Sequence, residues 1–249
     1  MNKSVLIAVS PPFVKKAIDY RIRMTRRLKL KLLPYSWLPP VLQFKRDGWN
    51  DRIYNSVPPV DPASVVIFGG YLGETTAAWL ARLPGAKIEV FEPVQTYASS
   101  IESRFTGEKV QVHPYGVAER REARNFYALG DATYAEGLPR NGLRVRAESS
   151  VSVNFISISE LVDLLPRNID VLEVNIEGGE YELLKLLSNA GILGGTINMF
   201  IQFHAVGIDT ADRIAIVRDE LTKTHELVWK YELVWEFWRL RNATVEKSI

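Results

Sequence analysis

Apolar and polar positions follow a regular order over most of this chain. Five short, β-branched runs predict buried strands, at residues 65–68, 87–91, 109–114, 169–176 and 196–203. The segments between and after them predict helices, at residues 73–83, 94–105, 159–165, 180–190 and 210–224. Strands that alternate with helices favour an α/β fold, in which helices cover both faces of a mainly parallel sheet.

Two further segments extend this pattern. Residues 151–156 form another extended run, after a polar, glycine-containing stretch at 125–150. We expect the following helix to be capped by Ser157 or Ser159, with Glu160 near its first turn. The C-terminal sequence HELVWKYELVWEFWRLR is aromatic and β-prone, and it predicts a closing hairpin that adds an antiparallel edge to the sheet.

The first 60 residues differ in charge from the rest of the chain. They hold 12 Lys and Arg against 3 Asp and Glu, a net charge of +9, whereas the whole chain carries only +2. Residues 13–33 predict a basic helix, and residues 41–62 read as a proline-containing connector, with Trp49 and Tyr54 as buried anchors. We therefore expect a basic N-terminal extension over residues 1–60 and a second domain over residues 61–249.

The basic extension has two readings. It contacts an anionic partner, such as membrane headgroups, an acidic glycan or nucleic acid, or it docks on the acidic body of its own chain. We favour a membrane surface or an anionic glycolipid, because the chain shows no recognisable RNA-binding motif or stacking platform. A nucleic-acid partner is not expected.

Composition narrows the chemistry. The chain contains no cysteine, which excludes disulfides, thiolate metal sites and a cysteine nucleophile. The apolar run at residues 5–9 is too short for a signal peptide, and no run reaches the roughly 18 residues that span a bilayer. We expect a cytoplasmic protein, peripheral to the membrane if its extension binds there. Its tryptophans and aromatic C-terminal segment also allow a homo-oligomer contact.

The first candidate site is the glycine turn after the first predicted strand. Gly69, Gly70 and Gly73 allow close approach of a ligand, and Glu92 follows Gly73 by 19 positions, where a carboxylate can bind a ribose diol. Because Leu72 breaks the dinucleotide pattern and no Walker lysine follows, we expect an adenosine cofactor without phosphates, namely S-adenosylmethionine. The alternatives are an ordinary strand-to-helix turn and, for Glu92, a helix cap.

The second candidate site is the turn IDVLEVNIEGGEYELL. Asn175, Glu177 and Glu180 follow the fourth strand of the alternating series, and His204 ends the fifth, so all four side chains should meet at one sheet edge. For a hydroxyl acceptor, we expect His204 first and Glu177 second as the general base, with Asn175 orienting a ligand. Glu180 also suits a helix N-terminus on dipole grounds alone.

These motifs resemble those of the FkbM-type S-adenosylmethionine-dependent methyltransferases. The matching stretches are IFGGYLGETT, FEPV, VHPYGVAER, IDVLEVNIEGGEYELL and IQFH. The resemblance implies a class I methyltransferase fold and O-methylation of a sugar, a glycan or a small-molecule acceptor such as a secondary metabolite. It also implies a substrate contact at Glu180 and cofactor contacts at Gly69, Gly70, Tyr71, Gly73, Thr75, Glu92 and Pro93.

The chain departs from the family pattern in both motifs. Ile67 and Tyr71 replace an aspartate and an asparagine of the family's glycine loop, and Glu173 and Asn175 replace a lysine and an aspartate of its acidic turn. These changes leave open a non-catalytic protein that binds the cofactor or a partner. The acidic residues and His204 match no defined metal motif, so no metal is expected.

Overall fold

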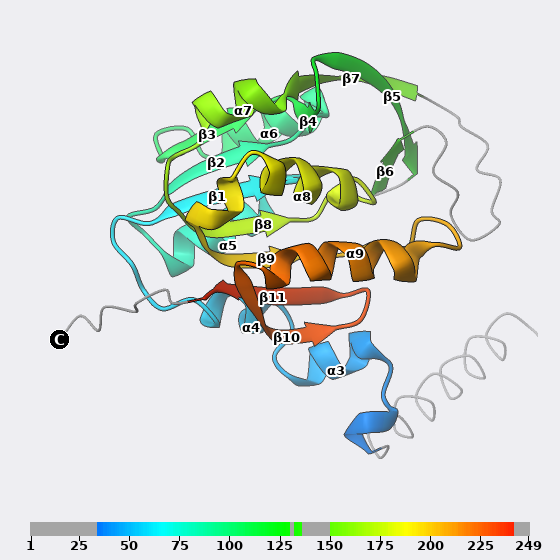
Figure 1. The fold of residues 1–249 in the computed structure, drawn as a ribbon. Helices are drawn as coiled ribbons and strands as arrows, with labels where there is room; N and C mark the ends of the chain where they lie inside the picture. Colours follow the sequence, from blue (N-terminus) through cyan, green and yellow to red (C-terminus); the bar gives the residue numbers. More distant parts are fainter. Residues whose placement is uncertain (1–33, 130–131, 136–149, 242–249) are drawn as a thin grey trace, which may run out of the picture. The chain divides into compact units, whose positions relative to one another are not determined.

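A computed structural model describes residues 34–129, 132–135 and 150–241 (Figure 1). The helix expected at residues 13–33 lies outside them. The chain divides into two compact units, Met1–Arg46 and Asp47–Ile249. The described part of the first unit contains the 3-10 helix η1 (Tyr35–Trp37) and helix α3 (Pro40–Arg46). The Gln43 side chain of α3 donates a 2.8 Å hydrogen bond to the carbonyl of Leu38, the residue that follows η1.

The stretch expected to be a connector carries helices, so the division falls earlier than residue 60. Helix α4 (Asn50–Asn55) belongs to the second unit, where the Tyr54 ring meets the Trp79 ring edge-on at 4.9 Å. Tyr54 is half-buried, but the expectation of a buried Trp49 is wrong, because this side chain is 39% exposed. Ile53, one helical turn further on, is the buried residue instead.

The main sheet of the second unit has seven strands in the order β10-β11-β9-β8-β1-β2-β3. Their bounds are β1 Ser64–Phe68, β2 Lys87–Phe91, β3 Val110–His113, β8 Ile169–Val174, β9 Thr196–Ile201, β10 His225–Tyr231 and β11 Trp235–Leu240. Strands β3, β2, β1, β8 and β9 pair in parallel. The five predicted strands are therefore confirmed, with ends that shift by at most two residues.

The C-terminal hairpin is also confirmed, with one correction. Strand β11 pairs antiparallel with both β9 and β10, so β10 runs in the same direction as the other strands. The antiparallel strand β11 consequently lies one place inside the sheet. The edge strand β10 runs parallel to the other strands, whereas we expected an antiparallel edge. Helix α9 (Thr210–Thr222) carries the chain from β9 to β10, and β11 then fills the space between them.

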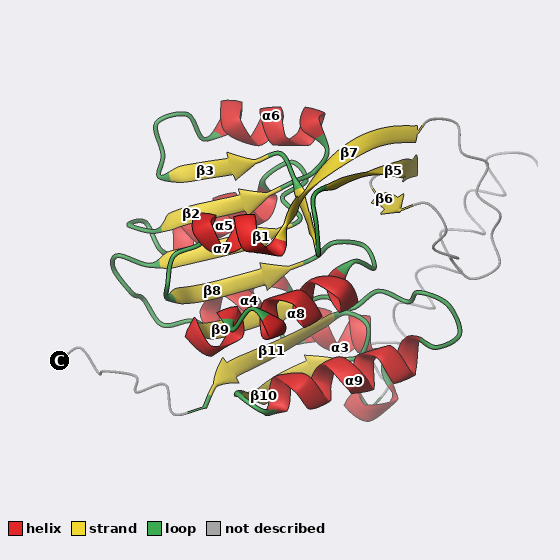
Figure 2. Ribbon diagram, turned by 45° about the horizontal axis from the view of Figure 1, so that its top comes forward, coloured by secondary structure: helices red, strands yellow, loops and turns green. Residues whose placement is uncertain are grey.

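Helices cover both faces of the main sheet (Figure 2). The helices α7 (Ile158–Leu164), α8 (Glu180–Asn189) and α9 pack on one face, over an apolar cluster that includes Phe68, Leu172 and Ile214. Helices α5 (Glu74–Arg82) and α6 (Gln95–Arg104) cover the other face, where Trp79 and Ile101 are fully buried. This arrangement confirms the predicted class I methyltransferase (Rossmann-like) fold.

A second, four-stranded sheet follows β3 in the sequence. It has the order β4-β7-β5-β6, with bounds β4 Gly116–Ala118, β5 Glu122–Leu129, β6 Ala132–Ala135 and β7 Ser150–Ser157. Of these strands the sequence indicated only β7, since β5, with the sequence EARNFYAL, shows neither a strict alternation of polar and apolar residues nor an apolar run along its whole length. Ser157 caps α7 together with Glu160, as predicted. Figures 1 and 2 show this sheet beyond the carboxyl ends of the parallel strands.

A buried carboxyl group lies in the middle of the main sheet. Glu173 in β8 is 1% exposed, and its Oε2 accepts a 2.6 Å hydrogen bond from Trp79 Nε1. Burial raises the pKa of this carboxyl group to about 7, although the Trp79 donor opposes the rise. The protonated form is therefore favoured in the folded chain.

This raised pKa predicts a specific pH dependence of stability. A carboxyl group with a higher pKa in the folded state contributes stability below its unfolded value of 4.5, and this contribution is lost as pH rises through about 7. Relative to Glu173→Gln, the wild-type free energy of unfolding should fall by about 1–3 kcal/mol between acidic and mildly alkaline pH. Urea titrations of both proteins across this pH range measure the difference. The control is Glu102→Gln, which makes the same change at an exposed position. Its free energy of unfolding should change with pH as that of the wild type does.

Candidate functional site

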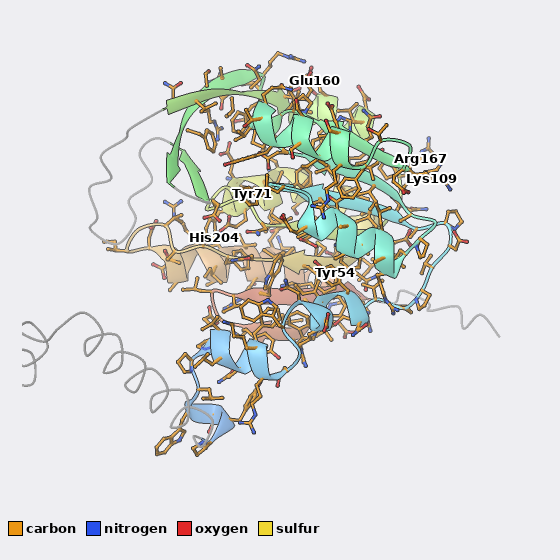
Figure 3. The ribbon with its side chains drawn as sticks, turned by 180° about the vertical axis from the view of Figure 1, so that it is seen from behind. Tyr54, Tyr71, Lys109, Glu160, Arg167 and His204 are labelled. Atoms are coloured by element: carbon orange, nitrogen blue, oxygen red, sulfur yellow. The ribbon has the colours of Figure 1, made fainter. Side chains whose placement is uncertain are left out.

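A cavity of about 520 Å³ opens at the carboxyl ends of β1, β2 and β8. Of the residues selected from the sequence, six line it: Gly69, Tyr71, Glu92, Pro93, Asn175 and Glu177. Figure 3 shows the labelled Tyr71 and His204 at this edge of the sheet, and Lys109 and Arg167 at the opposite edge. Two sequence motifs separated by about a hundred residues therefore meet in one cavity, at the position where open parallel sheets bind ligands.

The glycine turn brings two strand ends together. Gly69 has a φ of +92°, and a Cβ atom there would lie 2.0 Å from the backbone oxygen of Asn175, so no larger residue fits. Gly70 and Gly73 do not line the cavity. A Cβ on Gly70 would instead lie 2.7 Å from the Ile101 side chain, and one on Gly73 would lie 2.8 Å from the Phe105 ring. Their role is to let the turn pack against α6.

Glu92 lies at the end of β2 with its carboxylate held by the glycine turn. The backbone N–H of Tyr71 donates to Oε2 and that of Val94 to Oε1, each at 2.9 Å. Burial raises the pKa of the Glu92 carboxyl group, and these backbone donors oppose the rise. Since a carboxylate accepts about four hydrogen bonds, the side chain keeps acceptor capacity toward the cavity that it lines. It thus combines a fixed position with a site for a ligand hydroxyl.

Asn175 presents an unused acceptor at the end of β8. Its Oδ1 is buried and has no hydrogen-bond partner among the residues that the structure describes, although the residue lines the cavity. The hydroxyl of Thr75, in the first turn of α5, is also buried, but it interacts with the Glu173 carboxyl group and does not line the cavity. Because buried polar atoms are nearly always paired, the Asn175 oxygen indicates a donor supplied by a ligand.

Glu177, His204 and Glu180 form one cluster beside the cavity. The His204 imidazole lies between two carboxylates, with its Nε2 3.5 Å from Glu177 Oε1 and its Nδ1 3.4 Å from Glu180 Oε1. Glu177 has a φ of +53°, an uncommon backbone conformation for a non-glycine residue that is often found at functional sites. It is the member of the cluster that lines the cavity.

The charge of His204 changes the assignment of the general base. Burial alone lowers the pKa of the imidazole, but the carboxylates of Glu177 and Glu180 outweigh it and raise the pKa to about 9. At neutral pH the ring is therefore protonated and has no lone pair to accept a proton. The role of general base that we expected first for His204 fits Glu177 better.

Glu180 has a structural position rather than one in the cavity wall. Its side chain is 0% exposed, and its oxygens accept hydrogen bonds from the backbone N–H groups of His204, at 2.6 Å, and Gly178, at 2.8 Å. These bonds tie the end of β9 to the turn after β8. Glu180 does not line the cavity, and its carboxylate contacts His204 instead.

The sequence did not identify the aromatic wall of the cavity. The second sheet, the segment before it and the first turn of α6 contribute its side chains, which are Tyr97, Tyr115, Arg124, Phe126 and Phe155. The Arg124 guanidinium lies 4.5 Å from the centroid of Phe155 and forms two 2.9 Å hydrogen bonds to Glu182 of α8. The only available signal was the VHPYGVAER stretch, which supplies Tyr115. Arg124, Phe126 and Phe155 could not be found without the second sheet, in whose strands β5 and β7 they lie.

The described residues contain no group of three or more His, Cys, Asp or Glu side chains that could hold a metal ion. In the same part of the chain, no helix has both the length and the apolar character needed to cross a membrane.

The chain matches no protein-family model, and no curated protein is significantly similar to it in sequence. Solved structures are similar to it over about three-quarters of its length. A putative rRNA-methylase from Clostridium thermocellum is 8% identical over 77% of this chain and 92% of its own, with a TM-score of 0.49. The SAH-bound methyltransferase PaMTH1 of Podospora anserina is 9% identical over 77% and 76%, with a TM-score of 0.46. At such low identities the likeness concerns the fold alone.

Proposed function

We propose that the cavity binds S-adenosylmethionine and that the protein transfers its methyl group to a hydroxyl group of a sugar, a glycan or a small metabolite. The observation that carries this proposal is the buried Glu92 carboxylate, which faces a 520 Å³ cavity directly beside a glycine turn. A cavity of this volume lies in the range typical of cofactor and substrate sites. The resemblance of the glycine turn and of the acidic turn to FkbM-type methyltransferases supports O-methylation.

The residues of the cavity fit the proposed cofactor. Glu92 would accept hydrogen bonds from the ribose hydroxyls, and the unused Asn175 oxygen would accept one from the amino group of the methionine moiety. The aromatic rings of Tyr71 and Tyr97, in edge contact at 4.8 Å, give the cavity a wall that favours a cationic ligand. Bound there, S-adenosylmethionine supplies a methyl group on a positively charged sulfur atom.

We assign Glu177 the role of the general base that takes the proton of the acceptor hydroxyl. A sugar hydroxyl is a weak nucleophile, so a carboxylate that takes its proton while the oxygen–carbon bond forms accelerates the transfer. The protonated His204 ring lies beside the Glu177 carboxylate and orients it, and the Glu180 carboxylate in turn orients the His204 ring. The rest of the rate comes from positioning the acceptor oxygen, which the wall of Tyr115 and Phe126 achieves.

The two departures from the family motif are compatible with this assignment. Ile67 is fully buried within β1, so that position offers no side chain to a ligand. Asn175 cannot act as a base, but Glu177 lines the same cavity two residues later. The second candidate, a protein that binds the cofactor without catalysis, is favoured by Asn175 in place of the family aspartate.

Isotope transfer tests the proposal against that candidate. The protein is incubated with S-adenosylmethionine carrying a deuterated methyl group and with a glycan and metabolite extract, and products are analysed by mass spectrometry. We expect labelled products that require the protein, together with formation of S-adenosylhomocysteine. Cofactor binding without any labelled product would favour the non-catalytic protein and contradict methyl transfer.

A further inference from the structure

The described part of the first unit exposes an unusual concentration of apolar side chains. Trp37 in η1 is 71% exposed, and Tyr35 and Val41 are 40% and 41% exposed. All three lie within seven consecutive positions. A large aromatic ring held in water loses the favourable free energy that its burial would provide, so such a group marks an interaction surface. We call these three residues, with Lys45 and Arg46, the aromatic–basic patch.

The cations of the patch lie at the end of α3. Lys45 and Arg46 form the last turn of this helix, and both are exposed. The Arg46 guanidinium also lies 5.8 Å from the centroid of the Tyr35 ring, so one cation of the patch is adjacent to one of its aromatic rings. The sequence around the patch is strongly basic, with 12 Lys and Arg against 3 Asp and Glu in residues 1–60.

We propose that the aromatic–basic patch binds the surface of a lipid bilayer that contains anionic headgroups. Tryptophan and tyrosine favour the boundary between headgroups and acyl chains, because one part of each ring system is apolar and another forms hydrogen bonds. Lys and Arg beside them are attracted by anionic lipids. The patch combines both requirements, and the net charge of +9 in residues 1–60 complements an anionic surface.

This inference is independent of the proposed methyl transfer. It places the protein at a membrane surface through the first unit, whereas the cavity belongs to the second. Binding to vesicles without binding of the cofactor would support this inference and contradict the proposed function. Binding of the cofactor without binding to vesicles would support the proposed function and contradict this inference.

Vesicle sedimentation tests the patch. The full chain is mixed with vesicles of phosphatidylcholine, with or without about one-third phosphatidylserine, and the bound fraction is measured. We expect binding to the anionic vesicles that weakens as salt rises from about 0.1 M to about 0.5 M. Trp37→Ser should weaken binding about tenfold or more. Lys45→Gln combined with Arg46→Gln should weaken it roughly 25-fold, because each cation contributes roughly fivefold.

A matched control separates the patch from general hydrophobicity. Ile216 of α9 has the same exposed fraction as Trp37, 71%, but has no place in the patch. Ile216→Ser should bind vesicles as the wild type does, and circular dichroism confirms that all variants are folded.

Three results would overturn the inference. The first is binding of Trp37→Ser equal to that of the wild type, which would mean that other residues of the extension carry the interaction. The second is equal binding to neutral and anionic vesicles. The third is displacement from vesicles by single-stranded RNA together with loss of RNA binding in Trp37→Ser, which would assign the patch to nucleic acid.

Discussion

Replacement of Glu177 with glutamine is expected to lower methyl transfer by about 10²–10⁴-fold, the usual contribution of a general base. The amide keeps the size of the side chain but cannot accept the proton of the acceptor hydroxyl. The affinity for S-adenosylhomocysteine should change little, because Glu177 is assigned to the acceptor and not to the cofactor. Labelled product measured by mass spectrometry, beside calorimetric titration of S-adenosylhomocysteine, separates the two effects.

The exposed Glu119 provides the control for this variant, since Glu119→Gln makes the same chemical change away from the cavity. His204→Gln should also lose activity, because it removes the positively charged ring whose Nε2 lies 3.5 Å from Glu177 Oε1 and orients that carboxylate. Full activity in Glu177→Gln would remove this carboxylate from the mechanism and leave positioning as the source of the rate.

Replacement of Glu92 with glutamine should weaken S-adenosylhomocysteine binding by roughly 10–100-fold, the effect of losing about 1.5–3 kcal/mol of hydrogen bonding to a charged group. Glutamine has one acceptor oxygen, and the backbone N–H groups of Tyr71 and Val94 compete for it with the ribose hydroxyls. Calorimetry of the wild type and of the variant measures the change.

Glu102→Gln controls for the loss of one negative charge, because Glu102 is exposed on α6, the helix after the Glu92 turn. A melting curve establishes that Glu92→Gln keeps the glycine turn folded. If its dissociation constant equals that of the wild type, the ribose is not bound at Glu92, and the orientation of the cofactor in the cavity must be revised.

The periodic part of the chain was predictable because local sequence decides it. Strand β2 begins and ends at the predicted residues 87 and 91, since its apolar run is bounded by Gly85 and Pro93. The presence of Glu92 and Glu177 at one cavity was also predictable, because parallel strands end at one edge of the sheet. In these cases a short pattern determines the position of the side chain.

Properties that depend on distant contacts were not predictable in this way. The charge of His204 results from two carboxylates that the fold brings to opposite sides of its ring, so its unsuitability as a base at neutral pH required the structure. The burial of Glu180 depends in the same way on the backbone of the segment that follows β9. The aromatic wall was missed because its strands pair with each other over 30 residues of sequence, from Glu122 to Phe155.

The central claim, that the cavity binds an S-adenosyl cofactor, is tested most directly by calorimetric titration of the wild-type protein with S-adenosylhomocysteine. We predict saturable binding with one molecule per chain. Absence of any binding heat, both with this compound and with S-adenosylmethionine, in a protein shown to be folded would contradict the claim.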